Sequence, residues 1–138
     1  MFGYMKLAAV SAAALMAAQA AGARDLVIAS WGGNYQDAQR GAYFEPFAKE
    51  KGIAFTETTY LGGLAELKTM AETGDVTWDL VIAEGADLQV ACDEGLLEPI
   101  DMSILADGAD GTPAAEDFLP GALTECGVGT DIWATVIA

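Results

Sequence analysis

The sequence predicts an α/β fold in which a mostly parallel sheet is flanked by helices on both faces. Three short segments rich in apolar and β-branched residues alternate with three segments whose apolar residues recur at helical spacing. Glycines mark the breaks between them. This strand-helix order, repeated three times, is typical of a sheet whose neighbouring strands run in the same direction.

Residues 1–23 read as a secretory signal peptide and are set apart from the fold. Lys6 gives a positive start, residues 7–18 form an apolar run, and small-x-small cleavage sites end at Ala20 and Ala23. A retained membrane anchor would need about 20 apolar residues, and this run has about 12. We expect export to the periplasm, cleavage after Ala20 or Ala23, and a folded region over residues 24–138.

The first strand is expected at residues 26–30, because five apolar or small residues precede a glycine pair. Asn34 can cap the helix that follows. Pro46 should disturb this helix, and Gly52 should close it.

Two further strand-helix units follow. We expect a second strand at residues 53–60, where apolar and polar residues alternate, and a helix between the glycines at 62–63 and Gly74. A third strand is expected at residues 78–83, with a helix over residues 86–94. Residues 131–138 also read as a strand, with no turn or polar tail after it, so we expect the sequence to be a fragment of a longer protein.

The charge balance excludes one class of partner. From Arg24 onward the chain has five basic and twenty-one acidic residues, a net charge of −16. Nucleic acid is excluded, because phosphate neutralisation needs clusters of Lys and Arg. A cationic ligand fits this charge, although acidity for solubility alone fits it too.

Cys92 and Cys126 are the two cysteines, and the chain has no histidine. Two lone sulfurs cannot complete a tetrahedral zinc site, so we expect no metal. In an exported chain an even cysteine count favours a disulfide over free thiols. Closing a loop of about 35 residues would contribute roughly 4 kcal/mol in the chain-entropy model.

Four phrases in order carry a family resemblance: SWGGNY at residues 30–35, GDVTWDL at 74–80, CDEGLLEPID at 92–101 and FLPGA at 118–122. They resemble the periplasmic solute-binding proteins of ABC transporters, in the spermidine/putrescine-binding branch. The resemblance implies an incomplete first lobe of a two-lobed periplasmic-binding-protein fold. It also implies a polyamine ligand, a membrane permease as partner, a monomer and no cofactor. The second lobe would supply most of the cleft acids, so this chain alone should bind polyamine weakly or not at all.

A polyamine site needs aromatic faces along the methylene chain and carboxylates near the ammonium groups. Trp31 and Tyr35 flank the exit of the first strand, where the family's aromatic-rich loop touches ligand. Glu84 and Gly85 follow the third strand at the same edge, and Tyr60 is a weaker candidate. Core packing is the competing interpretation for the three aromatic residues, and a solvated surface acid is the competing interpretation for Glu84.

The loop after the first strand also allows an anionic ligand. Gly32, Gly33 and Asn34 place backbone N–H groups at a helix start, which attracts anions. The glycines can equally serve only to turn the chain. An anionic or other small ligand is therefore the alternative to polyamine, and a truncated exported module that binds no ligand is a second.

An enzyme is not expected. Asp79, Glu84 and Asp87 could supply an acid and a base, but the sequence has no histidine, no nucleophile elbow and no phosphate-binding loop with lysine.

Overall fold

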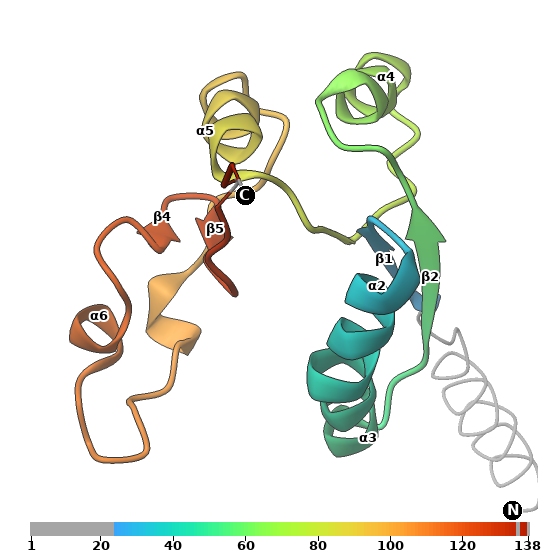
Figure 1. Cartoon of the computed structure of the whole chain (residues 1–138). Helices are drawn as coiled ribbons and strands as arrows, with labels where there is room; N and C mark the ends of the chain where they lie inside the picture. The colour runs from blue at the N-terminus through green and yellow to red at the C-terminus, as the bar shows by residue number, and fades with distance from the viewer. Residues whose placement is uncertain (1–23, 135, 138) are drawn as a thin grey trace, which may run out of the picture.

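The computed structural model describes residues 24–134, 136 and 137. The predicted signal peptide, residues 1–23, lies outside the described residues. Strands and helices alternate from the first described segment onward (Figure 1). The prediction of an α/β fold with a parallel sheet flanked by helices is confirmed.

The main sheet has three strands in the order β2-β1-β3. Its central strand is β1 (Leu26–Ser30), which pairs in parallel with β2 (Phe55–Thr59) and β3 (Leu80–Val81). The last three residues of β1 are buried, as expected of a central strand. The third strand is shorter than predicted, because only Leu80 and Val81 pair with β1.

The helix after β1 runs in three parts: α2 (Gly33–Gln39), a π-helical turn η2 (Arg40–Phe44) and α3 (Glu45–Lys51). The wider turn lies directly before Pro46, which has no N–H to continue the α-helical pattern. The predicted disturbance at Pro46 therefore takes the form of this turn. Gly52 ends α3 in the left-handed conformation, as predicted.

The predicted cap at Asn34 is wrong, because the helix begins earlier and Gly32 occupies the capping position. Gly32 has φ 74° and ψ −170°, a combination essentially confined to glycine. This conformation turns the chain abruptly from β1 into α2, so Asn34 already lies inside the first helical turn.

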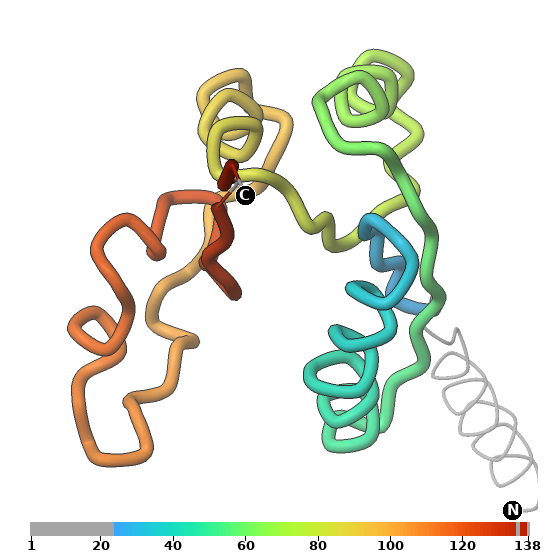
Figure 2. The backbone as a smooth tube through the Cα atoms, in the orientation of Figure 1, coloured from blue at the N-terminus to red at the C-terminus, as the bar shows by residue number. Residues whose placement is uncertain are grey.

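Helix α4 (Ala65–Thr73) follows β2 and ends at the left-handed Gly74. Helix α5 (Gly85–Asp93) follows β3. Figure 2 shows the chain leaving the sheet after β3 and building a second part around α5. That part contains the short helices η3 (Met102–Ile104) and α6 (Ala114–Asp117) and an antiparallel hairpin of β4 (Leu123–Thr124) and β5 (Gly127–Val128).

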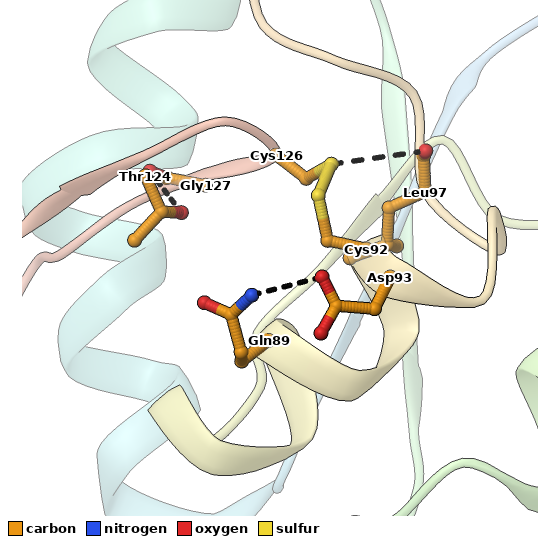
Figure 3. Close-up of a disulfide and its surroundings, with 7 residues drawn as sticks. All are labelled: Gln89, Cys92, Asp93, Leu97, Thr124, Cys126 and Gly127. Atoms are coloured by element: carbon orange, nitrogen blue, oxygen red, sulfur yellow. Dashed lines mark hydrogen bonds between the residues drawn. A yellow bond between two sulfur atoms is a disulfide. The ribbon is translucent and has the colours of Figure 1, made fainter.

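A disulfide joins this hairpin to α5. Cys92 lies on α5 and Cys126 lies between β4 and β5, with 5.8 Å between their Cα atoms (Figure 3). Gly127 packs so closely on Leu88 of α5 that a side chain at this position would collide with it. The hairpin is therefore held on α5 by both a covalent bond and tight packing.

The strand predicted at residues 131–138 is wrong within the described residues. Positions 131–134, 136 and 137 have no regular secondary structure. Ile132 and Val136 are each 78% exposed. No neighbouring strand among the described residues supplies the hydrogen bonds that an extended segment needs to become part of a sheet.

Among the described residues, no helix is long and apolar enough to cross a membrane.

Asp79 fastens β3 to the start of β1. Its carboxylate accepts a hydrogen bond from the Val27 N–H at 2.8 Å and two from the Arg24 guanidinium at 2.6 and 2.7 Å. These bonds, the Val27 N–H first, hold the pKa of the Asp79 carboxyl below its ordinary value. A depressed folded pKa stabilises the fold above the unfolded pKa of about 4, and this stabilisation is lost as the pH falls through the folded value.

We therefore expect Asp79→Asn to lower the free energy of unfolding by about 1 kcal/mol at neutral pH. The difference from wild type should shrink below about pH 4, as the wild-type carboxyl becomes protonated. Denaturant unfolding at neutral pH and below about pH 4 measures this difference in the free energy of unfolding. Asp75→Asn removes the same charge from an exposed position and should have little effect; an equal loss in both variants would contradict a specific role for Asp79.

Candidate functional site

A hollow of about 1160 Å³ opens where the chain leaves the carboxyl ends of β1 and β3. In a parallel sheet this edge is the usual place for a ligand. Trp31 and Tyr35 line it from the β1–α2 side, and Glu84 and Gly85 line it from the β3–α5 connection. Residues 119–122 and 126–133 line it from the second part of the chain.

Trp31 and Tyr35 form a stacked aromatic pair on one wall of the hollow. Their ring centroids are 5.4 Å apart and their planes differ by 23°. Both side chains are half-buried. The Trp31 indole nitrogen lies over Gly62, where an added Cβ would be 4.0 Å away. The pair is therefore packed from behind by the loop after β2 and still borders the hollow.

A partly buried polar network supports the loop that carries Trp31. The Gly32 N–H donates to Gln36 Oε1 at 2.8 Å, and Gln36 Nε2 donates to Glu57 Oε1 at 3.0 Å. Arg40 also donates to the Glu57 carboxylate. Burial opposes ionisation of Glu57, but the bonds from Arg40 and Gln36 outweigh it and hold the pKa of this carboxyl below its usual value. The network joins α2 and η2 to β2.

Gly32 is the position in this loop where a side chain would be both strained and crowded. Besides its positive φ, a Cβ on Gly32 would lie 3.1 Å from Thr59 Cγ2. We expect Gly32→Ala to lower the free energy of unfolding by about 2 kcal/mol. Gly41→Ala is the matched control, since Gly41 is helical and an added Cβ would have no neighbour within 4 Å. Thermal unfolding compares the two, and equal midpoints would contradict the assigned strain.

Tyr35 is also held by the far end of the described chain. Its hydroxyl donates to Asp131 Oδ1 at 2.9 Å. Partial burial, followed by this bond, raises the pKa of Tyr35 to about 12. Since the pKa lies far above neutrality, the hydroxyl stays protonated and acts as a donor.

Glu84 lies at the capping position of α5, where its backbone is extended. Its side chain makes no capping hydrogen bond, is half-buried and borders the hollow. Nearby, Asp87 Oδ2 accepts the Gly63 N–H at 3.1 Å and joins α5 to the loop after β2. Glu84 thus presents to the hollow a carboxylate without a capping bond, whereas the Asp87 carboxylate bonds the Gly63 N–H. Asp79 cannot work with Glu84 and Asp87 as an acid-base group, because its carboxylate is bound to Arg24 and to the Val27 N–H.

The structure brings four of the predicted site residues to the hollow and leaves three outside it. The four are Trp31, Tyr35, Glu84 and Gly85. Gly33 and Asn34 are exposed at the start of α2 but do not line the hollow. Tyr60 is 6% exposed, packs against the Trp78 ring at 5.3 Å and donates its hydroxyl to the Ile82 carbonyl. Tyr60 therefore matches the packing interpretation.

Sequence reasoning missed most residues that line the hollow, among them Trp78, Asp131 and Trp133. Asp131 and Trp133 had been included in a predicted strand, which hid a carboxylate and an aromatic ring two residues apart. Residues two apart lie on the same face of an extended chain, so the spacing of Asp131 and Trp133 is the signal that could have identified them as neighbours in a site.

Within the described residues, no group of three or more Cys, Asp or Glu side chains is placed to hold a metal ion.

Similar solved structures include periplasmic binding proteins and an ABC transporter protein from Rhodopseudomonas palustris. The described chain has their α/β fold and corresponds to a partial lobe. No protein-family model matches the chain.

A gamma-aminobutyric acid (GABA)-binding protein of Pseudomonas aeruginosa is 38% identical over 125 residues, which is 91% of this chain and 34% of the relative. The binding protein MotA from A. tumefaciens B6, in complex with glucopine, has a TM-score of 0.64 and 37% identity over 74% of this chain and 29% of its own. AgtB from A. tumefaciens R10, in complex with agropinic acid, has a TM-score of 0.56 and 49% identity over 60% of this chain and 26% of its own.

A GABA receptor structure is similar as well, with a TM-score of 0.56 and 43% identity over 59% of this chain. The chain spans about a third of the length of the curated relative. The predicted class, a binding protein of an ABC transporter, agrees with these relatives. The predicted polyamine branch does not, because the ligands in their names are GABA and opines.

Proposed function

We propose that the protein containing this chain is the substrate-binding component of an ABC importer and works in the periplasm. We propose further that its ligand is a small amino acid derivative with an ammonium group and a carboxylate, as in GABA. The observation that carries this proposal is the hollow at the sheet edge, where a stacked aromatic pair and the start of α5 with Glu84 lie on the same surface.

The groups around the hollow suit both ends of a zwitterion. Glu84 offers a carboxylate with no capping bond, which can pair with an ammonium group. Trp31 and Tyr35 offer ring faces for the methylene groups and for the cation.

The helix starts suit the carboxylate end. The first N–H groups of a helix have no intrahelical acceptor and carry a partial positive charge. Gly85, the first residue of α5, lines the hollow, and the exposed Gly33 begins α2 beside Trp31. A ligand with two ammonium groups and no carboxylate cannot accept hydrogen bonds from these N–H groups. The site therefore favours the anionic or other small ligand over the polyamine that the sequence resemblance implies.

In this proposal residues 1–23 direct export, and a second lobe closes over the ligand so that the closed form docks on the membrane permease. Trp31, Tyr35, Glu84 and Gly85 are the proposed ligand contacts from this lobe. Gly33 and Asn34 are proposed to contribute only backbone N–H groups at the rim. The disulfide between Cys92 and Cys126 fits the oxidising periplasm.

A matched series of four-carbon compounds tests the ligand class: GABA, butyrate, butylamine and putrescine. The longest protein encoded in the reading frame of this chain should be used, and its thermal unfolding followed with each compound. A bound ligand raises the stability by RT ln(1 + [L]/Kd), about 2.7 kcal/mol at a hundredfold excess over Kd. We expect GABA to raise the midpoint most and the single-charge analogues to have little effect.

A response to putrescine and butylamine without one to GABA would overturn the proposed ligand class and restore the polyamine. If none of these compounds and no opine shifts the midpoint, a binding function is contradicted and an exported module without a small ligand is favoured.

A further inference from the structure

One contact in the hollow joins parts of the chain that are 96 residues apart: the hydrogen bond from the Tyr35 hydroxyl to Asp131 Oδ1. The Thr130 hydroxyl donates to the same oxygen at 3.1 Å. Both hydroxyl groups therefore donate to the same side-chain oxygen, and Asp131 is the acceptor in both bonds.

The segment that carries Asp131 is anchored independently of Tyr35. It follows the hairpin that the disulfide holds on α5. The Gly129 N–H donates to the Ala122 carbonyl at 2.6 Å, which ties the end of the hairpin back on itself. Asp131 is therefore presented two residues beyond a fixed point, whereas Tyr35 belongs to α2 in the other part of the chain.

Tyr35 needs such a partner to keep one orientation. Its ring stacks on Trp31 on one side, and the ring faces the hollow among residues of both parts. A half-buried tyrosine without a hydroxyl partner would lose the bond and gain rotamer freedom, and a loosely held ring contributes less to ligand binding.

We propose that Asp131 is a positioning residue for ligand binding: it fixes the Tyr35 ring against Trp31 and so pre-organises the aromatic wall of the hollow. This inference rests on the proposed binding function. The same hydrogen bond joins α2 to the segment after β5 and so links the aromatic wall to residues 130–133.

The test uses Asp131→Asn, Tyr35→Phe and the double variant in the longest protein that carries this chain, with GABA as the probe. We expect each single variant to weaken GABA binding about tenfold, and the double variant to be no weaker than either single one, because both remove the same bond. Tyr43→Phe is the matched control. Tyr43 lies on η2, is 48% exposed and does not line the hollow, so its affinity should equal that of wild type.

A second readout follows the bond itself and does not depend on ligand. The ultraviolet absorbance of tyrosinate reports ionisation, and the Tyr35 pKa of about 12 should fall towards its ordinary value in Asp131→Asn. The Tyr35→Phe background identifies which transition belongs to Tyr35. If Asp131 served folding alone, Asp131→Asn would lower the stability but would not change both the Tyr35 ionisation and the GABA affinity.

The outcomes separate the two proposals. If wild type binds GABA and the variants bind it equally well, the positioning role is overturned while the binding function stands. Additive losses in the double variant would also overturn it. If wild type binds neither GABA nor an opine, the binding function fails, and the positioning role fails with it.

Discussion

Replacing Trp31 with alanine is expected to lower ligand affinity thirty- to a hundredfold, the largest loss from any single residue of this lobe. The indole forms the stacked pair with Tyr35, borders the hollow and packs over Gly62. Removing a large aromatic contact at the centre of a site costs about 2–3 kcal/mol of binding free energy. Calorimetric titration of the longest protein carrying this chain measures the loss.

Phe47→Ala serves as the control for Trp31→Ala. Phe47 is an aromatic residue on α3, is 49% exposed and does not line the hollow. It should keep the wild-type affinity. Unfolding midpoints of both variants must be compared, because a Trp31 variant that loses affinity and half its stability would indicate a packing role. Unchanged affinity in Trp31→Ala would contradict the proposed aromatic wall.

Removing the disulfide is expected to produce the largest loss of stability. The bond closes a loop of 34 residues that contains short helices and turns but little buried core. In the chain-entropy model this closure contributes about 4 kcal/mol. The double variant Cys92→Ala with Cys126→Ala should therefore unfold at a midpoint lower by roughly 15 °C.

Addition of a reductant provides the matched test. It should lower the midpoint of the wild type and leave the double variant unchanged. Alkylation of the folded, unreduced wild type is a direct check, because a bonded pair has no thiol to modify. Two freely alkylated cysteines would contradict the bond.

The order of strands and helices could be predicted from the sequence because its signals are local. The apolar run of β1 and the glycines that end α3 and α4 act within a few residues of where they stand. Gly32 as the cap could not be predicted in the same way. Thr59 of β2, which is 27 residues away in sequence, lies so close to Gly32 that it disfavours a side chain at the capping position.

The candidate site was only partly predictable for the same reason. Trp31 and Glu84 follow strands that meet at one sheet edge, a relation that parallel topology implies. The bond between Tyr35 and Asp131 arises from tertiary packing, and no pattern along the chain reports it. Tyr60 looks the same in sequence whether it faces a ligand or packs on Trp78.

The ligand class was the least predictable feature. A net charge of −16 and two aromatic residues favour a cation, but most of the acidic residues do not line the hollow. The helix starts at Gly33 and Gly85, which favour a carboxylate, are backbone features that side-chain composition does not report.

The most direct test of the proposed function is a calorimetric titration of the longest protein that carries this chain with GABA and, separately, with putrescine. We expect a saturable heat with GABA, lost in Trp31→Ala, and none with putrescine at the same concentrations. Saturable binding of putrescine with no heat from GABA would contradict the proposed ligand, and it would restore the polyamine function that the sequence resemblance implies.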